Sequence, residues 1–288
     1  MFAFEKYQRA ASVAEAVDML ARDPLSIVLA GGTDALVRLR EGHREYANVV
    51  DVNSIAELRE IADDGDAVRI GAGATFTSII QSDIIAEHVP ALAEAAGWVA
   101  GPQIRNVGTV GGNICNGSVC ADSVSALLVL DAHLDLVGPE GERVTPLRGF
   151  HLGPGKVELR TGELLRSIRI MKPEPALGAA YVKYSMRQAM DIATIGCGAA
   201  LKVVNGAATD LRLAFTVAAP TPVRCPEAEK AAEGLPLDEA MDAVCEAVVS
   251  DVTPRTSWRA DKDFRLHIIK TLARRMMTKA AQRSENGS

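Results

Sequence analysis

Seven residues of this chain, 107–113, hold three glycines together with a hydroxyl and a carboxamide, and this segment constrains the fold more than any other. Glycine lets a backbone approach a ligand closely and turn its N–H groups toward an anion. We therefore expect Gly111 and Gly112 to supply N–H donors, Thr109 a hydroxyl to phosphate, and Asn113 a carboxamide that donates and accepts. We call residues 107–113 the second glycine loop.

A first glycine loop, residues 30–34 (Ala-Gly-Gly-Thr-Asp), follows the short apolar run 26–30, which is typical of a buried strand. Its spacing is neither that of the Rossmann fingerprint nor that of the P-loop. A plain turn is the alternative for this loop alone, because glycine commonly serves turns. Two separate loops that could each bind a phosphate suit a dinucleotide, which carries two phosphates. Asp122 then opens a helix, as an N-cap or as a ligand residue.

Composition and charge exclude several classes of protein. With 48% hydrophobic and 24% charged residues, no bilayer-length apolar run and a net charge of −6 without a basic block, we expect a folded protein with no membrane or nucleic-acid partner. The N-terminus shows no leader pattern, which predicts a cytoplasmic protein. The five cysteines form no C-x-x-C pair and the histidines no zinc motif, so we expect reduced thiols and no metal.

The order of predicted elements divides the chain into three units. We expect an N-terminal unit over residues 1–58, a second over 59–172 and a third over 177–283, with the proline-marked connector 171–175 before the last. The third unit should contain strands at 181–186, 192–204 and 211–219 and helices at 237–249 and 262–280. In the last helix Phe264, Ile268, Leu272 and Met276 recur every four residues, which predicts a face packed on these strands.

The strings AGGTDALV (30–37), RNVGTVGGNICNGSVCADS (105–123), GFHLGPGKVEL (149–159) and GELLRSI (162–168) resemble the FAD-binding subunit of the molybdenum hydroxylases. This family contains xanthine dehydrogenase and carbon monoxide dehydrogenase. The resemblance runs from about Phe4 to Arg275 and is closest to the separate FAD subunits of bacterial xanthine dehydrogenases, through segments 101–106, 186–192 and 218–225.

The resemblance implies an α+β fold in which two α/β subdomains of the vanillyl-alcohol-oxidase/PCMH type hold an extended FAD. A C-terminal domain with a three-stranded antiparallel sheet and helices would follow. Carried over position by position, the implied FAD-binding residues are Ile27, Val28, Leu29, Ala30, Gly31, Gly32, Thr33, Asp34, Thr109, Val110, Gly111, Gly112, Asn113, Asp122, Leu165 and Lys183. Without the resemblance, Leu165 is an ordinary strand hydrophobe and Lys183 an ordinary surface lysine.

The same resemblance implies a role in electron transfer. A molybdenum-cofactor subunit would oxidise xanthine and pass the electrons to a [2Fe–2S] subunit. FAD would receive the electrons from that subunit and pass them to NAD+. The three subunits would form a heterotrimer or its dimer. No catalytic acid/base residue is expected in this chain. The alternatives are the FAD subunit of a hydroxylase for another heterocycle such as nicotinate, a self-sufficient flavin oxidoreductase, and a non-catalytic nucleotide-binding module.

Overall fold

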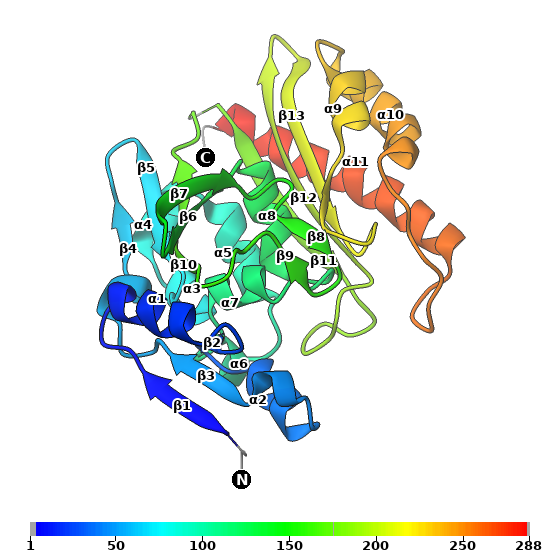
Figure 1. Ribbon diagram of the computed structural model, residues 1–288. Coiled ribbons are helices and arrows are strands. Elements are labelled where there is room, and N and C mark those ends of the chain that lie inside the picture. Colours follow the sequence, from blue (N-terminus) through cyan, green and yellow to red (C-terminus); the bar gives the residue numbers. More distant parts are fainter. Residues whose placement is uncertain (1–3, 175, 287–288) are drawn as a thin grey trace.

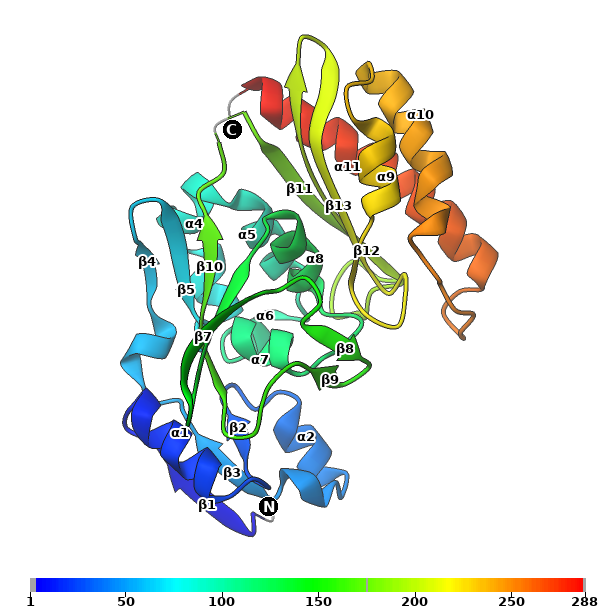
Figure 2. The ribbon, with the colours of Figure 1, turned by 45° about the horizontal axis from the view of Figure 1, so that its top comes forward.

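The computed structural model describes residues 4–174 and 176–286. The chain forms three main sheets in sequence order, and Figures 1 and 2 show them as successive layers from the N-terminal end to the C-terminal helix. A two-stranded ribbon of β8 and β9 adds to the second layer (His151–Gly153 and Lys156–Val157). The subdomain boundaries expected near residues 58 and 172 stay predictions.

The N-terminal layer is a parallel sheet of order β1-β3-β2, with strands Lys6–Arg9, Asn48–Asp51 and Ile27–Leu29. Helix α1 (Val13–Arg22) begins as expected at Ser12, whose hydroxyl accepts the Glu15 N–H at 3.1 Å. The layer also contains α2, η1 and η2 (Ala35–Arg40, Arg44–Tyr46 and Ala56–Arg59). Because β2 and β3 run parallel, the residues that follow them lie at one edge of the sheet.

The middle layer is an antiparallel sheet of order β4-β5-β10-β6-β7, and its apolar face packs on helices. The strands are Ile61–Asp63, Ala67–Gly71, Leu164–Met171, His133–Gly138 and Gly141–Pro146. The helices α3 to α8 are Phe76–Ile80, Asp83–His88, Pro90–Gly97, Pro102–Arg105, Val110–Cys115 and Asp122–Val129. The second glycine loop thus leads into α7, which packs on β10.

The C-terminal layer is an antiparallel sheet of order β11-β12-β13-β14, with strands Gly178–Tyr184, Ile195–Val204, Ala207–Thr216 and Val223–Arg224. Helices α9, α10 and α11 and the short η3 complete it (Pro226–Ala232, Leu237–Ala247, Lys262–Asn286 and Val248–Ser250). Helix α11 packs along β11 and β12, and Ile268, Leu272 and Met276 are buried there as predicted. Phe264 is an exception because 41% of it is exposed.

The structure corrects several element predictions. The expected three-stranded sheet has a fourth strand of two residues, β14, and α9 follows it because Pro226 stands at the first helical position, where its missing N–H costs nothing. The last helix continues six residues past the expected end at 280, to Asn286. The strand expected over 156–160 contains only Lys156–Val157.

Candidate functional site

The two glycine loops, which lie far apart in the sequence, contact each other. A Cβ atom on Gly31 would lie 2.0 Å from the Val107 carbonyl oxygen and 3.0 Å from the Gly108 Cα, so only glycine permits this approach. Figures 1 and 2 both place α7 beside the end of β2, where the first loop begins. The structure therefore brings together the two groups of residues that the sequence predicted separately.

The first glycine loop presents unpaired backbone donors. Among the described residues, the N–H groups of residues 30–34 have no hydrogen-bond acceptor, and Gly32 has a φ of +70°, which favours glycine. Successive N–H groups in such a turn form a concave anion-binding nest. The predicted pyrophosphate contact is therefore available at this loop.

A carboxamide and a carboxylate hold the first loop in place. Asn53 donates from Nδ2 to the Ala30 carbonyl at 2.8 Å and to Asp51 Oδ1 at 2.9 Å, and the Asn53 N–H also donates to Asp51 Oδ1. The Tyr7 hydroxyl donates to Asp51 Oδ2 at 2.5 Å. Burial raises the pKa of Asp51, but the bonds from Tyr7 and Asn53 outweigh it and leave that pKa below the ordinary value.

The second glycine loop differs from its prediction. The Gly111 N–H donates to the Ala72 carbonyl at 2.9 Å, and the Gly112 N–H donates to the Thr109 hydroxyl oxygen at 3.1 Å. These groups are engaged because the Thr109 hydroxyl caps α7 and residues 109–111 pair with the chain before α3. Expecting Gly111 and Gly112 as free donors was therefore wrong for this conformation.

Two further residues of the second loop have structural contacts. The Ser123 hydroxyl donates to Asn113 Oδ1 at 2.7 Å, which ties α7 to α8, and Val110 is fully buried. Leu165 is 3% exposed and belongs to the same hydrophobic core as Val110, beneath α7 on β10. The side chain of Leu165 thus supports the second loop from below.

Asp122 and Lys183 form a buried ion pair. Lys183 Nζ donates to Asp122 Oδ2 at 2.8 Å and to the Trp98 carbonyl at 3.2 Å, while the Tyr181 hydroxyl donates to Asp122 Oδ1 at 3.0 Å. Lys183 is only 6% exposed, so its interpretation as an ordinary surface lysine was wrong. Asp122 is the first residue of α8 rather than its N-cap, which is Ala121.

Burial governs the electrostatics of this pair. Removal from water raises the pKa of Asp122, and the charge and hydrogen bond of Lys183, together with the Tyr181 hydroxyl, oppose that shift. Burial likewise raises the pKa of Tyr181 well above its ordinary value. The pair joins α8 of the middle layer to β11 of the C-terminal layer, and the lysine ammonium has one more donor than its two bonds use.

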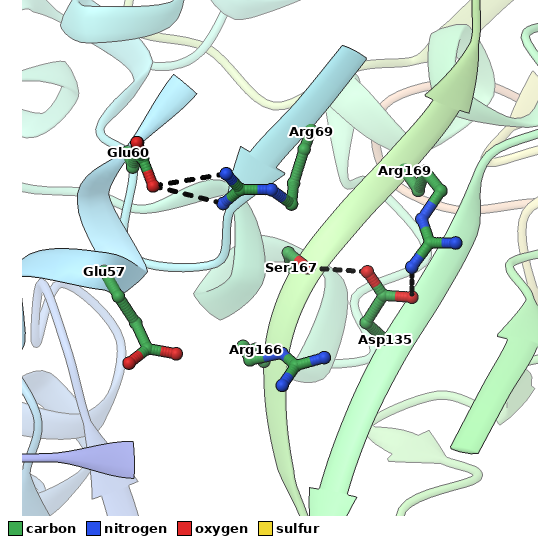
Figure 3. A pocket seen from close by; sticks show the side chains of 7 residues that line it. All are labelled: Glu57, Glu60, Arg69, Asp135, Arg166, Ser167 and Arg169. Carbon is green, nitrogen blue, oxygen red and sulfur yellow. Dashed lines mark hydrogen bonds and ion pairs between the residues drawn. The ribbon is translucent and has the colours of Figure 1, made fainter. Parts of the chain in front are cut away.

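One cavity of about 320 Å³ lies away from the predicted residues, on the polar side of the middle sheet (Figure 3). None of the predicted site residues lines it. Its arginines are neutralised inside the chain, since Arg69 pairs with Glu60 and Arg169 with Asp135. It is lined by Glu57, Glu60, Arg69, Asp135, Arg166, Ser167 and Arg169.

The cysteines show no sign of a metal centre in the part of the chain that the structure describes. No group of three His, Cys, Asp or Glu side chains there is arranged to hold a metal ion. Burial raises the pKa of Cys115 to about 12, and the thiols of all five cysteines are free. Across residues 4–174 and 176–286, none of the helices has the length and apolarity that a bilayer span requires.

Comparison with known proteins agrees with this architecture. Residues 2–173 match the family model described as FAD binding domain in molybdopterin dehydrogenase, and residues 180–280 match the CO dehydrogenase flavoprotein C-terminal domain. The chain belongs to this family of FAD-binding subunits. The expected family and the α+β fold class are thereby confirmed.

Individual relatives cover nearly the whole chain. The xanthine dehydrogenase FAD-binding subunit of Escherichia coli O157:H7 is 49% identical over 284 residues, covering 97% of both chains. The carbon monoxide dehydrogenase medium chain of Hydrogenophaga pseudoflava is 32% identical, covering 96% of both. A solved carbon monoxide dehydrogenase from the same organism superposes with a TM-score of 0.94 at 33% identity, covering 98% of this chain and 99% of that one.

Sequence reasoning missed Asn53, Asp51 and Tyr181, although each supports a predicted residue of this family member. A signal existed for Asn53, because it closely follows the strand 48–51, and the ends of neighbouring parallel strands lie at one sheet edge. No comparable local signal links Tyr181 to Asp122, since the pairing depends on how two sheets and a helix pack.

Proposed function

We propose that this FAD-binding subunit of a molybdenum hydroxylase serves a xanthine dehydrogenase and passes electrons from iron–sulfur clusters to NAD+. The observation that carries the proposal is the set of unpaired N–H groups on residues 30–34, in a loop whose Gly31 lies against the Val107 and Gly108 backbone. The 49% identity to a xanthine dehydrogenase FAD-binding subunit supports the substrate. Iron–sulfur and molybdenum-cofactor subunits would be its partners in a heterotrimer.

The chemistry of the described residues suits FAD. Unpaired backbone donors at the first loop offset the charge of a pyrophosphate without a lysine. A buried carboxylate, Asp122, is suited to accept bonds from ribityl or ribose hydroxyls, and Lys183 fixes its orientation. We assign the phosphate contacts to the first glycine loop and the hydroxyl contacts to Asp122, whereas the second glycine loop shapes the site and Leu165 and Val110 support it as buried apolar side chains.

The residues of the chain bind and orient rather than exchange protons. FAD supplies the chemistry when bound, because it accepts electrons singly or in pairs and so links one-electron carriers to a two-electron acceptor. The first glycine loop would hold the phosphates, Asn53 keeps that loop in position, and the Asp122–Lys183 pair joins the middle and C-terminal layers. His151 takes no part as an acid, because burial lowers its pKa.

An anaerobic titration of the FAD-loaded chain tests this function. We expect NADH to bleach the flavin absorbance and xanthine to leave it unchanged, since purine oxidation needs the metal centre of another subunit. Bleaching by xanthine would contradict the subunit assignment. If NADH reduced the flavin neither in the chain nor in the assembled enzyme, NAD+ would not be the acceptor.

The substrate of the assembled enzyme has a second candidate. A nicotinate dehydrogenase FAD-subunit of Eubacterium barkeri is 34% identical to this chain over 227 residues. In our proposal the molybdenum site lies on another subunit, so the residues of this chain do not select the substrate. An assay of the assembled enzyme with xanthine and nicotinate side by side distinguishes the two candidates. We expect turnover of xanthine.

A further inference from the structure

Three arginines gather at one end of the C-terminal sheet without an acidic partner. Arg255, Arg259 and Arg265 all act electrostatically on the Cys120 thiol, and Arg255 and Arg259 both lower the pKa of Arg265, after the larger effect of burial. None of the three forms an ion pair with a carboxylate in the described residues. Arg265 is only 2% exposed, so its charge is buried.

Several polar atoms of this cluster are buried without partners. The Arg265 guanidinium donates to the Thr194 carbonyl and, at 2.9 Å, to the Ser257 hydroxyl. Its Nε, the Nε of Arg259 and the hydroxyl of Thr194 are all buried and have no hydrogen bond to any described residue. A buried cation with unsatisfied donors is costly unless an anion compensates it.

Neither Asp261 nor Asp122 forms an ion pair with these arginines. Asp261 Oδ1 accepts the Phe264 N–H at 2.8 Å at the start of α11, and Asp122 is paired with Lys183. The arginines therefore leave a local excess of positive charge beside the loop that ends at Asp122. Such a cluster favours an oxoanion, because guanidinium groups bind phosphate oxygens with paired donors.

Exposed aromatic rings belong to the same segments as the cluster. Trp258 is 76% exposed and the Arg259 guanidinium lies 4.2 Å from its ring centroid. The Tyr184 and Phe264 rings lie 6.0 Å apart, and these residues directly follow Lys183 and precede Arg265. Planar rings beside an anion site suit a ligand that carries both phosphates and flat heterocycles.

We propose that Arg255 and Arg259 bind the pyrophosphate of the nicotinamide dinucleotide that exchanges electrons with FAD, an inference that rests on the proposed function. Arg265 acts as a positioning residue, because its bonds to Thr194 and Ser257 hold the arginine-bearing loop against the sheet. The Thr253 N–H donates to the Ala218 carbonyl and the neighbouring Val217 N–H to the Val119 carbonyl, so the arginine-bearing loop starts beside the segment that leads to Asp122 and the proposed flavin site.

The test uses NADH-dependent dye reduction by the assembled enzyme. We expect Arg255→Gln and Arg259→Gln each to raise the KM for NADH about tenfold with little change in kcat, since each removes a charge-assisted contact to the ligand. Arg22→Gln is the matched control, because its exposed guanidinium lies on α1. Retained flavin absorbance shows that the variants fold.

Inorganic pyrophosphate gives a second readout that does not depend on electron transfer. It should compete with NADH and raise the melting temperature of the native chain more than that of the Arg255→Gln/Arg259→Gln double variant. An unchanged KM for NADH together with no competition by pyrophosphate would overturn the inference. So would variants that lose their partner subunits but keep the KM, because the cluster would then be a protein contact.

A failure of the proposed function would give a different experimental result from a failure of this inference. A native enzyme that reduces dyes with its own substrate but never reacts with NADH would reject NAD+ as the acceptor. In that case binding of pyrophosphate to the native chain, and its loss in the double variant, would still report an anion site, but the dinucleotide assignment would be overturned.

Discussion

Both glycine loops contain a glycine pair and a threonine, but they differ in whether their backbone N–H groups are hydrogen-bonded. Residues 30–34 leave their N–H groups without acceptors among the described residues, whereas the N–H groups of residues 110–113 are bonded within the chain. A glycine pair therefore has two uses here. In the first loop it leaves backbone donors unpaired, and in the second it allows a close approach of backbone to backbone.

The difference follows from what each loop is attached to. The first loop ends a parallel strand at the sheet edge, where no further strand accepts its donors. The second loop pairs with the residues before α3 and is then capped by Thr109. This contrast supports our proposal that the first loop binds the cofactor phosphates and that the second shapes the space around them.

The largest effect is expected from Gly31→Val, which forces the loops apart. The added Cβ would stand 2.0 Å from the Val107 carbonyl oxygen, so one of the two backbones must move. We predict a loss of FAD affinity of at least about a hundredfold, seen as loss of flavin absorbance. Gly97→Val is the control, since Gly97 faces open space. Normal flavin content in Gly31→Val would contradict the account.

Asn53→Ala should weaken the first loop without touching the second. The Ala30 carbonyl loses its donor at 2.8 Å, so the loop samples conformations in which its N–H groups diverge. We expect the Kd for FAD to rise about tenfold, measured by fluorescence titration. Ser54→Ala removes a neighbouring bond to the Ala10 carbonyl and should leave that Kd unchanged. Equal effects of the two variants would refute a specific role for Asn53.

Acid should loosen the first loop through Asp51. Its pKa in the folded state lies below the ordinary 3.8, so the unfolded chain binds its proton more readily, and the stability that Asp51 contributes is lost as pH falls through 3.8 and below. We predict that Asp51→Asn lowers the free energy of unfolding by about 1 kcal/mol at pH 7. The difference should shrink toward pH 3 in urea titrations; a constant difference would exclude this linkage.

The smallest effect compares one threonine from each loop. Thr109→Val removes the cap of α7 and should lower the free energy of unfolding by about 1 kcal/mol, with Thr109→Ser restoring it. Thr33→Val should change it by less than about 0.5 kcal/mol, because the Thr33 hydroxyl has no hydrogen bond to a described residue. The reverse order in denaturant unfolding would break the comparison.

Much of the local structure was predictable from the sequence. The capping pair Ser12 and Glu15 located α1, and the apolar run before residues 30–34 located a strand. Short or irregular elements such as β14 were not predictable, because two residues carry too little pattern and form a strand only beside β13. The sequence predicted which residues form the site but not their geometry.

Long-range contacts explain what the sequence left open. Asp122 and Lys183 are 61 residues apart, and nothing in either segment indicates that the lysine is buried against the carboxylate. The contact of Gly31 with Val107 likewise depends on how two layers dock. Whether the N–H groups of a glycine loop are free is decided by such docking, which is why Gly111 and Gly112 were misjudged as donors.

Amide hydrogen–deuterium exchange of the chain with and without FAD tests the central claim most directly. We predict that residues 30–34 exchange rapidly without FAD and become protected when it binds, because their N–H groups then gain acceptors. Residues 110–113 should be protected in both states, since they are already bonded. Protection that appears only at residues 110–113, with residues 30–34 unchanged, would contradict the assignment of the cofactor phosphates to the first glycine loop.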